Sequence, residues 1–94
     1  MARVIALPRR LDTAACTELH AVLIAHRHAP IDLDGTATDH IGAVGAQLLL
    51  AAFRSWSDPG TFRITDLQQS ALRCLAELGI TPEQIGAARA EVTR

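Results

Sequence analysis

Residues 31–53 read IDLDGTATDHIGAVGAQLLLAAF, and this stretch decides the fold class. Ile31-Asp32-Leu33-Asp34 alternates apolar and acidic side chains, as a strand with one buried face does. A polar, turn-rich stretch from Gly35 to Gly42 follows, and Ala43 to Ser57 is a strongly apolar helical pattern. The order strand, loop, helix predicts that this helix packs on a sheet that contains the strand.

The residues before this stretch predict one strand and one helix. An apolar run that stops at Pro8 indicates a strand of about five residues. Asp12 is suited to the N-cap of a helix that Pro30 ends. The predicted buried face of this helix carries Ala15, Leu19, Val22, Leu23 and His26.

The residues after it predict a third strand and a third helix. Asp58-Pro59-Gly60 is a strong turn, and Thr61 to Thr65 alternates as a strand. Asp66, with Gln69 three residues later, predicts a capped helix start, and Gly79 is placed to end that helix. The predicted inner face carries Leu72, Leu75, Ala76 and Leu78.

A last helix is predicted from Thr81-Pro82-Glu83-Gln84, which supplies a cap, a first-turn proline and a closing glutamine, to about Val92. The alternating elements favour a single α/β domain over residues 1–94, with a small, mostly parallel or mixed sheet of about 3–5 strands and about four helices packed on it. Only three strands are evident. We therefore expect either a further short strand around Arg9–Leu11 or a homodimer that completes the layer.

Composition limits the function classes. Hydrophobic residues make up 49% of the 94 residues and charged residues 20%, so the chain has enough apolar side chains for one core. The net charge is −1, all nine basic residues are arginines and aromatics are 3%, which argues against nucleic-acid binding. No apolar run is long enough for a signal peptide or a membrane span, so we expect a cytoplasmic protein without membrane insertion.

The stretch from Asp34 to Leu50 resembles, without gaps, the signature of STAS domains, the family of the anti-sigma-factor antagonists. Thr36 falls on the serine of the family's first triplet, Ile41 on its apolar loop residue and Gly45 on its signature glycine. The similarity extends from about Val4 to Ile80. It implies a STAS-like α/β fold that acts by binding other proteins.

The resemblance breaks at the family's phosphorylation loop. STAS regulators carry the phosphorylated hydroxyl in an Asp-Ser-Ser-Gly loop, and this chain has Gly42, Ala43 and Val44 there. The resemblance therefore implies a domain that is not phosphorylated at the usual place. Thr36 and Thr38 are nearby hydroxyls that remain candidate acceptors, although threonines in such loops ordinarily form turn hydrogen bonds.

The outer side of the apolar helix is the predicted partner surface. A helical wheel places Leu50 in the middle of a polar face formed by Gln47, Arg54 and Ser57. Small residues beside it allow a second surface to approach closely, and the resemblance implies a partner surface at the same place. The predicted partner-binding residues are Gly42, Ala43, Val44, Ala46, Gln47, Leu50 and Arg54.

The resemblance thus implies a non-catalytic protein-protein interaction module in bacterial signalling, of the anti-sigma-factor antagonist or chemotaxis type. Its partner would be a signalling kinase or an anti-sigma-like ATPase. One alternative is a cytosolic STAS subunit that supports the ATPase of a lipid-transport ABC system. Another alternative, of a different class, is a small-anion or nucleotide binder at the Gly42–Gly45 helix start, where no P-loop lysine is present.

Enzymatic and metal-binding functions are not predicted. Cys16 and His20 are one helical turn apart, but zinc needs three or four convergent ligands. Asp39-His40 has the pairing of an acid–base dyad without a serine or cysteine nucleophile at a recognisable spacing. We expect no cofactor, no metal and no catalytic residue.

Overall fold

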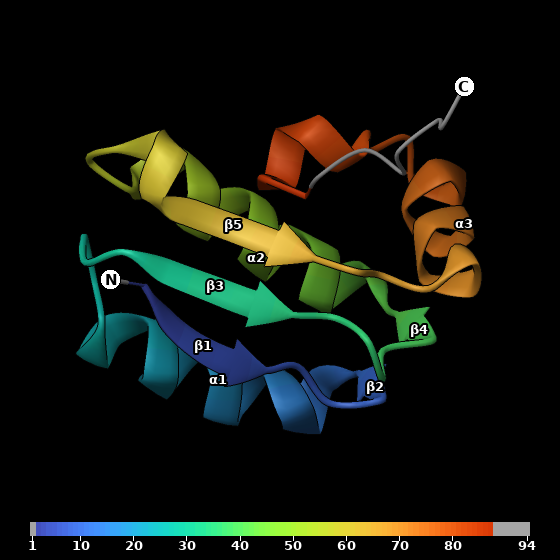
Figure 1. Ribbon diagram of the computed structural model, residues 1–94. Coiled ribbons are helices and arrows are strands. Elements are labelled where there is room, and N and C mark those ends of the chain that lie inside the picture. Colours follow the sequence, from blue (N-terminus) through green and yellow to red (C-terminus); the bar gives the residue numbers. More distant parts are fainter. Residues whose placement is uncertain (1, 88–94) are drawn as a thin grey trace.

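The computed structural model describes residues 2–87, which form a parallel sheet with helices on one side (Figure 1). The main sheet has the order β1-β3-β5, from β1 (Arg3–Ala6), β3 (Ile31–Asp34) and β5 (Phe62–Thr65), and both pairings are parallel. Ile5, Leu33 and Ile64 share one row across the sheet. The expected α/β class with a mostly parallel sheet is confirmed.

A second, two-stranded parallel sheet pairs β2 (Arg10–Leu11) with β4 (His40–Ile41). The strand expected around Arg9–Leu11 is therefore present. It does not widen the main sheet, because it pairs with the loop strand β4 instead. The main sheet keeps two outer strands, β1 and β5.

Helices α1 (Thr13–Ala25) and α2 (Ala43–Ser55) pack against each other and lie behind the sheet in Figure 1. Asp12 caps α1 as predicted, since its Oδ1 accepts a hydrogen bond of 3.0 Å from the Ala15 N–H. The buried side chains of α1 are Cys16, Leu19 and Leu23, while Val22 and His26 are only partly buried. Helix α3 (Gln69–Glu77) contacts β4 at one end of the sheet.

One predicted helix start was wrong, and one predicted helix is shorter than expected. Asp66 does not cap α3, because its backbone is left-handed (φ 60°) and Gln68 occupies the cap position. The capping box at Thr81 forms, but it opens only the short 3-10 helix η2 (Pro82–Ile85), which left-handed Gly86 ends. The described residues therefore contain three α-helices rather than about four, and the rest of the helix predicted to Val92 lies outside them.

The core lies between the sheet and the helices. Ile31, Leu33 and Ile64 point into it from the strands and are at most 1% exposed. Trp56 follows α2, packs edge-on against Phe62 at 5.0 Å between ring centroids and donates from Nε1 to the Ala29 carbonyl at 2.9 Å. Its indole is thus buried with its polar atom satisfied.

Gly45 lets α2 approach β2 closely. A Cβ at this position would lie 2.7 Å from the Leu11 carbonyl oxygen, which no side chain tolerates. The contact sets where α2 begins, and the glycine that the family resemblance singled out is therefore also required by packing.

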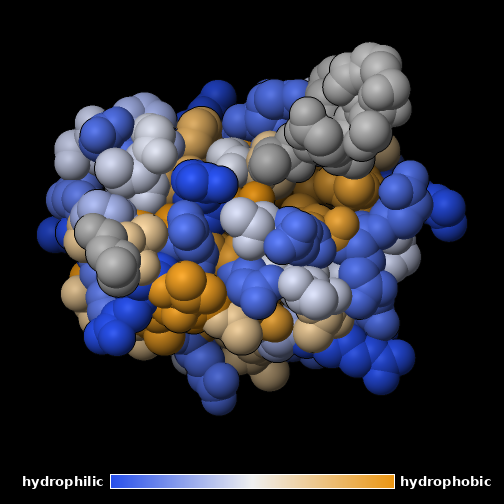
Figure 2. All heavy atoms as spheres, viewed as in Figure 1, coloured by the Kyte–Doolittle hydropathy of each residue, from blue (hydrophilic) through white to orange (hydrophobic). Residues whose placement is uncertain are grey.

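No helix among residues 2–87 covers the other face of the main sheet, which is the face turned to the viewer in Figures 1 and 2. Val4, Asp32 and Arg63 lie in one row on this face. Val4 is 65% exposed, and Arg63 Nε approaches Asp32 Oδ1 at 3.9 Å. The face shows polar groups with an apolar patch over β1 (Figure 2).

Candidate partner-binding surface

A groove runs between α1 and α2 on the outer side of the helical layer. It consists of three adjoining hollows, of about 170, 340 and 240 Å³ from the start of α2 to its end. The first two share Thr13 and Val44, and the last two share His20 and Leu48, so each hollow borders the next. We call this feature the α1–α2 groove.

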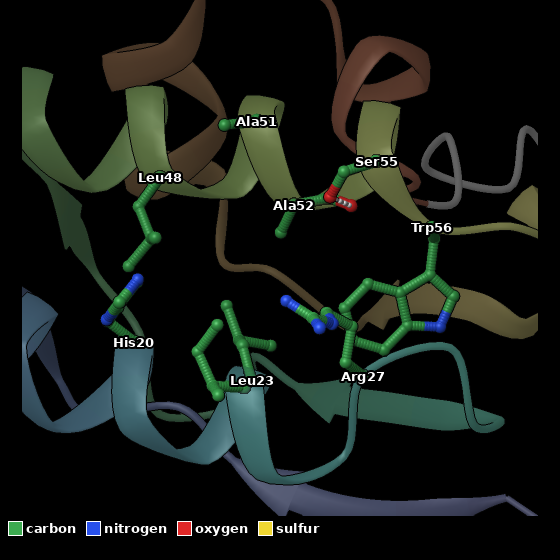
Figure 3. Close-up of a pocket in the computed structure, with 9 residues that line it drawn as sticks. His20, Leu23, Arg27, Leu48, Ala51, Ala52, Ser55 and Trp56 are labelled. Carbon is green, nitrogen blue, oxygen red and sulfur yellow. Dashed lines mark hydrogen bonds between the residues drawn. The ribbon is translucent and has the colours of Figure 1, made fainter.

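The last hollow shows why the groove exists (Figure 3). His20 and Leu48 face each other at one end, and Arg27 and Trp56 close the other. Ala51 and Ala52 contribute only methyl groups from α2, so the helices cannot fill the space between them. The resulting hollow has an almost wholly apolar lining.

Exposed apolar side chains flank the α1–α2 groove. Ile24 on α1 is 50% exposed and Val44 on α2 is 52% exposed, and Leu48 between them is half-buried. Large apolar side chains with this exposure are few in the described part of the chain, and two of them border one groove. Clustered rather than scattered exposure is typical of an interaction surface.

The charge around the middle and last hollows is positive or neutral. Arg27 lines the last hollow, and no acidic residue lines either of them. Among the described residues the salt bridges are Arg9–Asp39 and Arg63–Asp32, so Arg27 has no carboxylate partner in this part of the chain. Arg54 is also exposed on α2. A carboxylate on a binding partner would be attracted to Arg27.

The structure separates the predicted partner-binding residues into two groups. Ala43, Val44, Gln47 and Arg54 are exposed on α2, and half-buried Gly42 is its N-cap. Ala46, by contrast, is fully buried, and Leu50 packs against the core. The predicted exposure of Ala46 was wrong, and Leu50 is only partly exposed rather than the centre of an open face, so its role in binding stays a prediction.

The reason is the segment η2. The helical wheel assigned the side of α2 around Leu50 to solvent, whereas η2 packs against α2. Phe53 lies on that same side of α2, and its ring is so close to Gly86 that a Cβ added there would lie 2.9 Å from it. The solvent-facing side of α2 is consequently rotated toward Val44 and Ala51, which border the α1–α2 groove.

The two candidate phosphate acceptors differ in accessibility. Thr38 is fully buried, and its Oγ1 donates to the Pro8 carbonyl at 2.8 Å, so a kinase cannot reach it in the folded chain. Thr36 is exposed, but its Oγ1 and backbone N–H both donate to Asp34 Oδ1, at 2.6 and 2.9 Å. These bonds lower the pKa of the Asp34 carboxyl, the side-chain bond more than the backbone bond.

The structure also brings together two residues that sequence spacing did not connect. The Sγ of Cys74 on α3 lies 3.7 Å from Nδ1 of His40 on β4. Asp39 does not orient this imidazole, since it pairs with Arg9 at 2.9 Å. The two residues are 34 positions apart, so sequence spacing could not predict that they lie close together. Their proximity results from the contact between α3 and β4. Among residues 2–87 no group of three or more His, Cys, Asp or Glu side chains is arranged to hold a metal ion.

The start of α2 has a mixed environment for an anion. Gly42 caps the helix without a side-chain hydrogen bond, which leaves first-turn N–H groups facing the first hollow. Asp12 lines the same hollow, and its carboxylate caps α1 by accepting from the Ala15 N–H. An anion at this helix start would therefore meet a like charge.

Comparison with known proteins gave no match among family models, curated proteins or solved structures. None of the helices among residues 2–87 has both the length and the apolar character that crossing a membrane requires. The candidate surface therefore rests on the geometry of the α1–α2 groove.

Proposed function

We propose that this chain is a non-catalytic protein-binding module whose α1–α2 groove holds a segment of its partner. The observation that carries the proposal is the row of adjoining hollows, mainly apolar in the middle and last ones, flanked by exposed Ile24 and Val44. Apolar grooves between two helices commonly receive a third, amphipathic helix. The partner segment is then an amphipathic helix of about three turns, because α2 is 13 residues long and rises about 1.5 Å per residue.

Charge defines the partner segment further. Arg27 lines the last hollow without a carboxylate partner among the described residues, and no acid lines the middle hollow. The complementary helix carries apolar side chains on one face and an aspartate or glutamate at the edge that meets Arg27. Arg54 adds positive charge on the exposed side of α2.

The resemblance to STAS regulators supports a bacterial signalling partner, such as a kinase or an anti-sigma-like ATPase. Gly42, Ala43 and Val44 supply no hydroxyl at the family's phosphorylation loop, so binding is not switched there. Thr36 is the one of the two candidate acceptors that is exposed. A lipid-transport ATPase is the alternative partner, and identifying the protein that this chain captures from its native host distinguishes the two pathways.

Charge placed in the groove tests the proposal. Ile24→Glu and Val44→Glu should each weaken partner binding by about 10-fold or more, since truncating or charging a central apolar contact costs about 1–3 kcal/mol. Leu78→Glu is the matched control, because Leu78 is similarly exposed, at 43%, and lies outside the groove at the C-cap of α3. Binding is measured by titration calorimetry with the partner that wild-type protein captures. Equal affinity for all three variants would refute the groove as the binding surface.

The small-anion alternative predicts a different result. Thermal-shift measurements with nucleotides and phosphate would show stabilisation that a combined His40→Ala and Gly42→Asp change abolishes. The Asp12 carboxylate in the same hollow disfavours this alternative. A flat screen would exclude it and leave the protein-binding proposal intact.

A further inference from the structure

The outer edge of β1 carries backbone groups that point away from the sheet. Arg3 N donates to the Pro30 carbonyl at 3.2 Å and Leu7 N to the Asp34 carbonyl at 2.8 Å. Parallel ladders bond through alternate residues, so Arg3, Ile5 and Leu7 direct their polar groups to β3. Val4 and Ala6 therefore direct N–H and C=O outward, where no strand of residues 2–87 pairs with them.

A hollow of about 190 Å³ lies along this edge, between β1 and α1. It is lined by Ile5, Ala6, Pro8, Ala15, Glu18, Leu19 and Val22. Glu18 is the only charged residue in this lining. Sheet edges that must stay unpaired usually carry a charge, a proline or a bulge. Arg3 stands at the start of β1 and Pro8 beyond its end, but the central run Val4-Ile5-Ala6 has none of these.

We propose that two copies of this chain pair along β1, antiparallel and about a twofold axis, to form one continuous sheet. In the proposed register Val4 lies opposite Ala6 of the second copy, and Ile5 lies opposite Ile5 on the axis. Every outward N–H and C=O of Val4 and Ala6 then has a partner. The two edge hollows meet, and their apolar linings cover each other.

The charges on this edge match those of a second copy. Arg3 lies at the start of β1, and Glu18 shares the edge hollow with Ala6 and Pro8 at the end of β1. Neither forms a salt bridge within the described residues. Antiparallel pairing brings the start of one β1 to the end of the other, so Arg3 of each copy meets Glu18 of its mate. This reciprocal match selects a second copy of the chain over an unrelated strand.

A proline at an outward position tests the pairing. Ala6→Pro removes an N–H that faces away from β3, so the ladder within each chain is retained while the intermolecular bond is lost. By sedimentation equilibrium at up to about 200 µM, wild-type chain should be a dimer, Ala6→Pro a monomer and the control Ala6→Ser a dimer. A monomeric wild-type chain would overturn the proposal, as would a dimeric Ala6→Pro variant.

Charge reversal keeps the test decisive if Ala6→Pro fails to fold. Arg3→Glu and Glu18→Arg alter exposed side chains and should each raise the dimer dissociation constant by about 10-fold. The double variant restores the opposite-charge pair and should recover the wild-type constant. Weakening that persists in the double variant would contradict the proposed register.

Disulfide trapping reports the register directly. Ile5→Cys places two thiols on the twofold axis, and residues directly opposite in such a pair have Cβ atoms about 4.5–5.5 Å apart. Oxidised glutathione should convert Ile5→Cys to a disulfide-linked dimer, seen on a non-reducing gel. Ile24→Cys, exposed in the α1–α2 groove, is the control and should remain monomeric on the gel. Equal cross-linking of the two variants would contradict pairing at β1.

This dimer edge is separate from the α1–α2 groove, so either proposal can fail alone.

Discussion

The two outer strands of the main sheet have different edges. The outer edge of β5 is covered by the chain itself: Ile64 N donates to the Gly86 carbonyl at 3.0 Å, and Ile64 and Ala87 form a parallel bridge. The outer edge of β1 has no such cover among residues 2–87, and Val4 on this strand is 65% exposed. One sheet thus has a closed edge and an open edge.

From this difference we expect the β5 edge to affect folding of the single chain and the β1 edge to affect association. Closing β5 requires that the chain turn back after η2, which it does at left-handed Gly86, and it buries Ile85 completely. The closed edge therefore contributes to the stability of the single chain. The open edge of β1 contributes little to that stability, because its outward groups have no strand partner among residues 2–87. Changes at the two edges should separate folding from association.

The largest difference in the free energy of unfolding is expected between two variants that shorten an apolar side chain, one at each edge. Ile85→Ala should lower the free energy of unfolding by about 2–5 kcal/mol, since Ile85 is fully buried and the change leaves a cavity. Val4→Ala at the open edge should change it by no more than about 0.5 kcal/mol under dilute, monomeric conditions. Urea denaturation measures both. Similar losses for the two variants would show that the β1 edge is also closed in the single chain.

A smaller loss is expected from adding one methyl group to the turn that closes β5. A Cβ on Gly86 would lie 2.8 Å from the Phe62 carbonyl oxygen, and the residue has φ 78°. Gly86→Ala should therefore cost about 1–3 kcal/mol through strain and crowding. Gly60→Ala is the matched control, because a Cβ there has its nearest neighbour at 3.5 Å and φ is not positive. Equal stability of the two variants by thermal denaturation would mean that Gly86 is not needed to close the edge.

The sequence predicted the elements better than their surroundings. The apolar helix and the cap at Asp12 were predicted from local patterns and are present, whereas the strand near Arg9–Leu11 was one of two alternatives for completing a thin sheet and pairs outside that sheet. Local patterns also misplaced the start of α3 and extended η2 into a longer helix. A capping signature indicates the structure that a segment favours on its own. The chain after η2 instead pairs with a strand that is distant in the sequence, through the contacts of Ile64 with Gly86 and Ala87.

The same limit explains the errors in the candidate surface. A helical wheel shows which residues share a side of α2, but not which sides neighbouring segments cover. Leu50 was assigned to solvent, and only the packing of η2 against α2 turns that side inward. The α1–α2 groove was not predicted at all, because it depends on Ala51 and Ala52 facing α1 across a gap. Exposed Ile24, on the side of α1 away from its predicted core face, was the signal in the sequence.

The smallest effect is expected at the end of β3, the strand that lies between the two edges. The Thr36 hydroxyl and N–H lower the pKa of the Asp34 carboxyl, so the folded chain binds its proton less readily than the unfolded chain does. The resulting stabilisation is present above the ordinary carboxyl pKa of about 3.9 and is lost as the pH falls through the lowered value.

Thr36→Val removes the larger of the two causes, the side-chain bond, and keeps the backbone bond. The variant should melt a few degrees lower at neutral pH, and the gap to wild type should narrow as the pH falls below about 4. Thr61→Val is the control, because the Thr61 hydroxyl donates to the Asp58 backbone carbonyl and its loss should not depend on Asp34 ionisation. A gap that stays constant with pH for Thr36→Val would show that the Asp34 charge does not stabilise this end of β3.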